Sequence, residues 1–173
     1  MSAHGPILSR VGASRKAGAV QIKELNVLVQ KRIFDTFKKV YGLEKDAYWN
    51  KGVLDKGIKS KAYTTSLDDE DDVRLPLENY LDFIEYKKIV ENKVHWPLFK
   101  PVFDIPERGD KGRAKNLIWM EKINELRRIP AHPTESRSYR VEDFGYLDYI
   151  YGELTRRLDE NAEVPSENTV VPT

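Results

Sequence analysis

Apolar residues recur at three- and four-residue steps along most of this chain, the spacing that gives an amphipathic α-helix one buried face. The first such stretch begins near Gln21 and ends at Gly42, and a glycine just after the last apolar position is typical of a helix C-terminus. Its apolar positions are Ile22, Leu25, Val29, Ile33, Phe37 and Val40. The pattern therefore predicts one long helix at the start of the ordered chain.

The middle of the chain predicts shorter elements. Residues 46–54 indicate a second, short helix, and residues 59–72, which are rich in Ser, Thr and acidic residues, indicate a mobile loop. Pro76 suits the first turn of a third helix that is expected to end around Asn92. Residues 95–103 contain two prolines four positions apart, which should prevent a regular helix and leave a short helical turn under the bundle.

Two further helices are predicted in the second half. The fourth runs from about Arg113 to Arg128, and its apolar arc is wide enough for a central position. Pro130 removes an amide donor and its ring presses on the carbonyl of Leu126, so we expect this helix to kink or stop near Arg128. The fifth, over residues 144–158, has a narrow apolar seam of the coiled-coil type. That seam packs either into the bundle or against a second protomer.

These helices predict an all-α fold, a bundle of four to five helices, because no strand pattern or internal repeat accompanies them. With 173 residues and 40% hydrophobic content, the chain can bury one core. We expect a flexible N-terminal segment over residues 1–20, a single helical domain over residues 21–158 and a disordered acidic tail over residues 159–173.

Composition narrows the class of protein. The absence of cysteine excludes disulfides, zinc–thiolate sites and thiol catalysis. No apolar run approaches the roughly 20 residues of a membrane span, so we expect a soluble, cytoplasmic protein without membrane contact. The net charge is only +1, but nine Lys or Arg face five Asp or Glu between Ile105 and Arg140. This local basic excess suits an RNA or nucleotide ligand, and a solvated helix face explains it equally well.

The densest chemistry lies at the end of the fourth predicted helix. Arg127 and Arg128 precede Pro130 and His132, and His132 is one of only three histidines. On a straight helix the side chains of Arg127 and His132 would diverge by about 140°, so a bend at Pro130 is needed to bring them together. A guanidinium can grip phosphate oxygens bidentately, and an imidazole can exchange a proton near neutral pH. Such a pair suits a phosphodiester and needs no metal.

The sequence RRIPAH at residues 127–132 resembles the Arg-x4-His motif of HEPN (higher eukaryotes and prokaryotes nucleotide-binding) domains, small helical bundles found in toxins and anti-phage nucleases. The flanking residues, INEL before the motif and Pro133 after it, are also similar to that superfamily. At the level of helix pattern the resemblance covers residues 77–158, so a HEPN-like bundle is expected.

The resemblance implies a metal-independent endoribonuclease without a cofactor, acting in phage defence or in a toxin system. In such an enzyme two protomers form a homodimer in which both motifs line one cleft. Arg127 would hold the scissile phosphate, and His132 would act as general base or acid. The candidate contacts to the RNA substrate are Asn124, Arg128, Arg137 and Arg140.

Two alternatives stay open. The chain can be a non-catalytic HEPN-like dimerisation or interaction module, as a domain of a larger defence protein with its own protein partner. Arg128 favours this alternative, because active members often have a small polar residue there. In a purely structural interpretation, the two arginines pair with nearby carboxylates and His132 caps the helix C-terminus. His95 is interpreted as a packing histidine in preference to a ligand.

Overall fold

The computed structural model describes residues 5–107, 116–131 and 138–165 of the chain. Within these ranges all regular structure is helical, which confirms the predicted all-α class. The α-helices are α1 (Gly5–Tyr41), α2 (Ala47–Gly52), α3 (Lys56–Ser66), α4 (Phe83–Glu91), α5 (Trp96–Phe103), α6 (Ile118–Ala131) and α7 (Val141–Glu160). Two short 3-10 helices, η1 (Glu44–Asp46) and η2 (Leu77–Tyr80), connect them.

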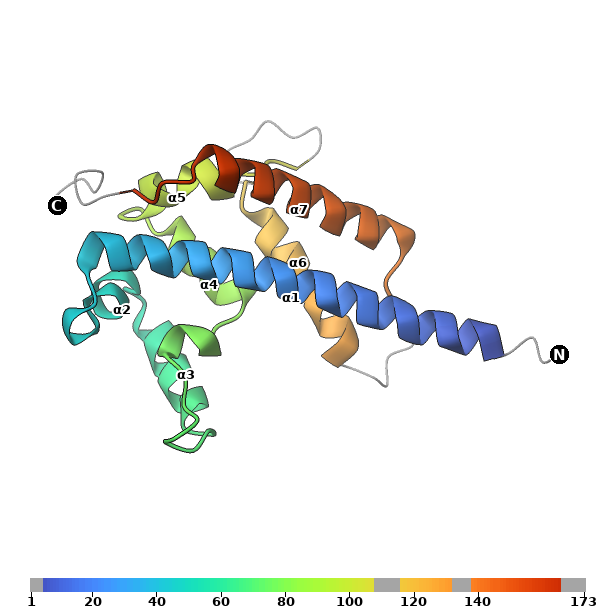
Figure 1. Cartoon of the computed structure of the whole chain (residues 1–173), viewed down its shortest axis with the longest axis horizontal. Coiled ribbons are helices and arrows are strands. Elements are labelled where there is room, and N and C mark those ends of the chain that lie inside the picture. The colour runs from blue at the N-terminus through green and yellow to red at the C-terminus, as the bar shows by residue number, and fades with distance from the viewer. Residues whose placement is uncertain (1–4, 108–115, 132–137, 166–173) are drawn as a thin grey trace.

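Helix α1 is the longest element and the others are arranged around it (Figure 1). It packs against α2, α4, α6 and α7, whereas α4 also packs on α6 and α5 on α7. The whole apolar stripe predicted for this helix is buried, from Ile22 to Val40. Because one helix contacts four others, its apolar face holds the single core together.

Helix α1 begins at Gly5, well before the start near Gln21 that the apolar pattern predicted. Part of the reason is a contact made by Gly18, a residue without an apolar side chain. A Cβ added at Gly18 would lie 2.2 Å from Cε2 of Tyr139, so the aromatic ring packs directly on the helix backbone. Hydrophobic periodicity cannot report a buried glycine, and the pattern therefore missed this turn of the helix.

The loop predicted for residues 59–72 is wrong in its first half, because α3 extends to Ser66. The Asp55 carboxylate caps this helix by accepting hydrogen bonds from the amides of Gly57 and Ile58, at 2.8 and 3.1 Å. Ile58 and Ala62, one turn apart, are buried. Two apolar positions make a weak periodic signal, so the pattern missed this helix. Its start is stabilised by the cap, which satisfies free amides of the first turn.

The third predicted helix is also divided. Instead of one helix from Pro76 to Asn92, the chain forms η2, passes through Leu81 in an extended conformation and begins α4 at Phe83. Asp82 and Glu85 form a capping box, in which the Asp82 amide donates to Glu85 Oε2 at 2.9 Å. A capping box marks a new N-terminus, so the helix restarts there.

Helix α5 is regular despite its two prolines, so the expected irregular turn is wrong. Pro97 lies in the first turn, where an amide has no acceptor within the helix. Pro101 then removes only the one hydrogen bond that its amide would have donated to the Pro97 carbonyl. The helix compensates by burying Leu98, Phe99, Val102 and Phe103.

The apolar seam of α7 packs into the bundle, mainly against α5 and α1. Leu147, Ile150 and Leu154 are buried, whereas Tyr151 is exposed. The ordered chain continues past residue 158, where the sequence placed the end of the domain. Here Arg32 donates to the Asn161 carbonyl at 2.7 Å and Lys39 donates to the Val164 carbonyl at 2.6 Å. These two bonds fasten the segment after α7 to α1.

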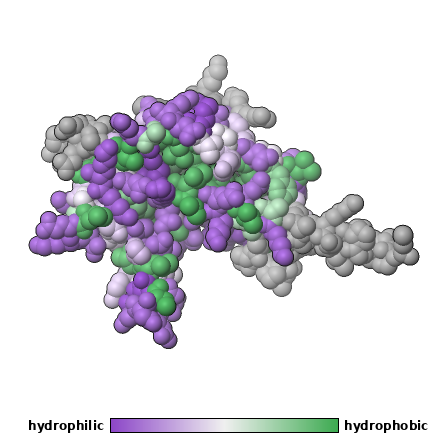
Figure 2. Space-filling model, in the orientation of Figure 1, coloured by the Kyte–Doolittle hydropathy of each residue, from purple (hydrophilic) through white to green (hydrophobic). Residues whose placement is uncertain are grey.

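On the face shown in Figure 2, hydrophilic residues predominate and hydrophobic residues lie in patches between them. Among the described residues, no helix combines the length and the apolar character that crossing a membrane requires.

Candidate functional site

We predicted a kink or a stop near Arg128, and the stop is wrong, because helix α6 continues through Pro130 to Ala131. Pro130 has no backbone N–H, so the Leu126 carbonyl lacks the donor that it would otherwise have within the helix. The buried Tyr139 supplies a substitute, because its hydroxyl donates to the Leu126 carbonyl at 3.0 Å. A side chain from the segment before α7 thus replaces the missing backbone donor, and the motif-bearing helix keeps its last turn.

The hydrogen bond from the Tyr139 hydroxyl to the Leu126 carbonyl should contribute measurably to stability. Tyr139→Phe is expected to lower the free energy of unfolding by about 1–3 kcal/mol, because the buried Leu126 carbonyl loses its partner. In a Pro130→Ala background the new amide can donate to that carbonyl, so the same change should cost clearly less. Urea unfolding of the four proteins measures the coupling. An equal cost of Tyr139→Phe in both backgrounds would contradict this account.

The guanidinium of Arg127 lies between two polar partners. Nη2 donates to Asn124 Oδ1 at 3.3 Å, one turn back on α6, and Nη1 lies 3.4 Å from Asp82 Oδ1 at the start of α4. The side chain is 40% exposed, and its buried Nε has no hydrogen-bond partner in residues 5–107, 116–131 and 138–165. Charge-assisted hydrogen bonds are usually about 2.7–2.9 Å long, so the Asp82 contact is loose. Donor capacity is therefore left for a ligand.

Arg127 forms part of the wall of a pocket of about 450 Å³. Helix α1 contributes one side of it, α4 the second, and Arg127 with Tyr139 the third. The lining residues are Ala19, Ile22, Lys23, Asn26, Asp82, Phe83, Arg127 and Tyr139. The volume lies in the range of small-molecule sites. Lys23 and Arg127 outnumber the one carboxylate, so the pocket favours an anionic group.

The carboxylate of this pocket is shared between cations. Besides Arg127, Asp82 faces Lys61, whose Nζ lies 4.0 Å from Oδ2. Lys61 in turn bonds to Glu85, the partner of Asp82 in the capping box. Asp82 therefore has a structural role at the start of α4 as well as its contact with Arg127. Because it is not committed to Arg127 alone, an incoming anion can compete for the guanidinium.

The structure brings together only part of the predicted site. Asn124 bonds to Arg127, which makes it a positioning residue for the guanidinium. Arg128 is exposed and does not line the pocket, although it is adjacent to Arg127 in sequence. Arg140 is exposed at the N-cap of α7, next to the pocket residue Tyr139. His132 and Arg137 lie outside the described residues.

Comparison with known proteins identifies no relative. No family model, no curated protein and no solved structure matches the chain. Its function is therefore inferred from the residues of the site.

Sequence reasoning missed four polar residues of this pocket. Lys23 and Asn26 carried no signal, because polar residues on an amphipathic helix usually face solvent. Asp82 could have been found as half of the capping box with Glu85. Tyr139 could have been found from the unpaired carbonyl that a proline inside a helix creates, since a buried carbonyl requires a donor.

Proposed function

We propose that the chain is a metal-independent endoribonuclease of the HEPN type, active in phage defence or in a toxin system. The observation that supports this proposal is the placement of the Arg127 guanidinium on the wall of an open pocket with a net basic lining. Arg127 binds the scissile phosphate and stabilises the charge that develops on its oxygens. His132 follows α6 directly after its last residue and transfers the proton.

The reaction needs both a base and an acid. The base removes the proton of the ribose 2′-hydroxyl, whose oxygen attacks the phosphorus, and the bond to the 5′-oxygen of the next nucleotide breaks. The acid protonates that leaving oxygen, and the products are a 2′,3′-cyclic phosphate and a 5′-hydroxyl. Each copy of the chain has one motif histidine. A homodimer with two motifs in one cleft would supply one histidine for each role.

The direct test uses the purified chain and a labelled single-stranded RNA in the presence of EDTA. We expect cleavage to fragments that end in a cyclic phosphate. A matched pair of variants, Arg127→Ala and Arg156→Ala, separates the pocket arginine from an exposed arginine on α7. The first should slow cleavage and the second should not. Full protection of the RNA by EDTA, or products with a free 3′-hydroxyl, would contradict the proposal.

A second candidate function is a non-catalytic interaction module that uses the same pocket to hold an anionic partner. The contact between Arg127 and Asp82 favours it, because the carboxylate partly neutralises the guanidinium in the absence of a ligand. In that case the chain would bind RNA without cutting it. The cleavage experiment with EDTA distinguishes the two candidates.

Both candidates predict that Asp82 competes with an anionic ligand. Asp82→Asn should raise the affinity for RNA by up to about fivefold, because partly exposed ion pairs of this kind contribute at most about 1 kcal/mol. Asparagine keeps the capacity to cap α4. Binding is measured with the His132→Ala protein, so that the RNA is not consumed. The control is Asp68→Asn, which removes an exposed carboxylate that does not line this pocket. Equal effects of the two substitutions would count against the competition.

A further inference from the structure

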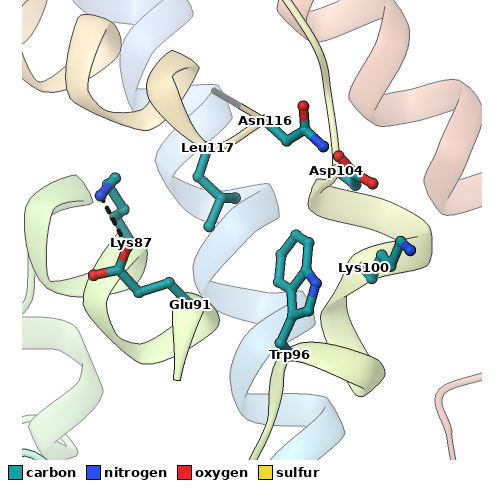
Figure 3. A pocket seen from close by; sticks show the side chains of 7 residues that line it. All are labelled: Lys87, Glu91, Trp96, Lys100, Asp104, Asn116 and Leu117. Carbon is teal, nitrogen blue, oxygen red and sulfur yellow. Dashed lines mark hydrogen bonds and ion pairs between the residues drawn. The ribbon is translucent and has the colours of Figure 1, made fainter. Parts of the chain in front are cut away.

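A second pocket lies at the other end of the pair formed by α4 and α6. Its volume is about 350 Å³, and its lining side chains come from α4, from α5 and the residue after it, and from the two residues before α6 (Figure 3). The lining residues are Lys87, Glu91, Trp96, Lys100, Asp104, Asn116 and Leu117. No residue of this pocket lines the pocket at Arg127, so the two are separate.

The clearest sign of a ligand is the carboxylate of Asp104. Its Oδ1 atom is buried and has no hydrogen-bond partner among the residues that the structure describes. Buried polar atoms are nearly always paired, and an unpaired acceptor costs about 1–3 kcal/mol. Asp104 itself lines the pocket, so a rotation of its side chain would bring this acceptor to a donor that comes from outside the chain.

The surrounding backbone holds Asp104 in place. The amide of Asp104 donates to the Lys100 carbonyl at 3.2 Å, and the amide of Ile105 donates to the Asn116 carbonyl at 3.2 Å. The indole of Trp119 donates to the Phe103 carbonyl at 3.0 Å. The first bond closes the last turn of α5, and the other two tie its end to the start of α6. Asp104 and Asn116 therefore present a carboxylate and an amide to the pocket from adjacent segments (Figure 3).

The other side chains supply an aromatic surface and a cation. The half-buried indole of Trp96 lies between the aliphatic Leu117 and Lys100 (Figure 3). Lys87 is occupied by ion pairs with Glu91 at 2.9 Å and with Glu121 at 3.3 Å. Lys100 is exposed, and no carboxylate of the described residues pairs with it. Among the described residues, the groups left for a ligand are thus one acceptor, one amide, one aromatic surface and one ammonium.

We infer that this pocket binds the guanine base of a nucleotide. Guanine presents two adjacent donors, the N1–H and the 2-amino group, which match the two oxygens of a carboxylate such as Asp104. The Asn116 amide can donate to the O6 atom, and the ring can stack on Trp96. Lys100 provides a charge for the phosphate. Adenine presents an unprotonated N1 atom at the same edge, so its lone pair would oppose the carboxylate.

The inference does not depend on RNA cleavage. Leu117 precedes Arg127 by ten residues, which is roughly 15 Å along a helix at 1.5 Å per residue. The base pocket and the arginine pocket therefore occupy opposite ends of α6, and each can be inactivated alone. The chain could bind guanine without cleaving RNA, and it could cleave RNA without binding guanine.

Isothermal titration calorimetry of the full chain with GMP, IMP and AMP tests the assignment. GMP should bind about tenfold or more tightly than AMP, because a paired base contact contributes about 1–3 kcal/mol of discrimination. IMP lacks the 2-amino group and should fall between them. Asp104→Asn should remove most of the preference for GMP over AMP. Trp96→Leu should weaken the binding of all three nucleotides. The control Asp68→Asn should change none of these affinities.

A second comparison identifies the source of the guanine. Two five-nucleotide RNAs, AAGAA and AAAAA, are titrated into the His132→Ala protein. If AAGAA binds more tightly than both AAAAA and free GMP, and Asp104→Asn removes this difference, the pocket is assigned to RNA. Binding of GMP that is as tight as AAGAA assigns it to the free nucleotide. Equal affinity for guanine and adenine ligands, binding that is unaffected by Asp104→Asn, or no binding of any guanine ligand would overturn the inference.

Discussion

His132→Ala is expected to slow RNA cleavage by about 10²–10⁴-fold, the range that a positioned proton-transfer group contributes. In the proposed dimer the substitution removes both motif imidazoles from the cleft, whereas Arg127 and the pocket that it lines remain. The RNA affinity should therefore change little while the cleavage rate falls. Single-turnover cleavage at saturating enzyme, followed over a range of pH, measures the rate of the chemical step separately from binding.

The matched control is His4→Ala, which removes another of the three histidines from a position far along the chain from the motif. This variant should cleave at the wild-type rate and with the wild-type pH profile. If His132→Ala cleaves as fast as His4→Ala, the proposed general acid–base role of His132 is excluded. A loss of RNA affinity equal to the loss of rate would instead indicate that His132 contributes to binding.

Acidification is expected to destabilise the fold through His95. This residue is fully buried against Phe37 and Tyr41, and its Nε2 atom shares a 2.7 Å hydrogen bond with the Tyr41 hydroxyl. Its Nδ1 atom has no hydrogen-bond partner within the described part of the chain. Burial lowers the pKa of His95 from its ordinary value of 6.5 to about 4, because the apolar surroundings disfavour the imidazolium. This environment fits the packing role that the sequence suggested.

The sign of the effect follows from proton uptake. Between pH 6.5 and pH 4 the unfolded chain binds a proton at His95 and the folded chain does not, so the free energy of unfolding falls as the pH falls. The loss from this one group should amount to about 2 kcal/mol between pH 7 and pH 5. Below pH 4 the folded state also becomes protonated, and the loss levels off.

Urea unfolding of the wild type and of His95→Gln at pH 7 and pH 5 measures this contribution. Glutamine does not titrate and can still bond to the Tyr41 hydroxyl, although it costs some stability at both pH values. The wild type should lose more stability than the variant between the two pH values, by the amount assigned to His95. Parallel losses in the two proteins would show that other groups, chiefly carboxylates, account for the acid sensitivity.

The candidate site shows how far the sequence could be interpreted. Arg127 was predicted as the phosphate ligand from its neighbours on one helix, and the structure places it on the wall of a pocket. Asp82, its ion-pair partner, is 45 positions earlier in the chain, and no local pattern links the two. Arg128, adjacent to Arg127, is exposed outside the pocket. Helix periodicity determines which residues share a face but leaves open which other helix that face will meet.

The sequence by itself determined the helical class, the central apolar stripe of α1 and two buried positions of α7, Leu147 and Leu154, because the apolar period is a local property of the chain. Only the tertiary structure decided that α6 continues through Pro130. The Leu126 carbonyl takes its donor from Tyr139, a residue 13 positions away that reaches it because Gly18 leaves space for its ring on α1. Contacts of this kind depend on side chains brought together by folding, and no local pattern contains them.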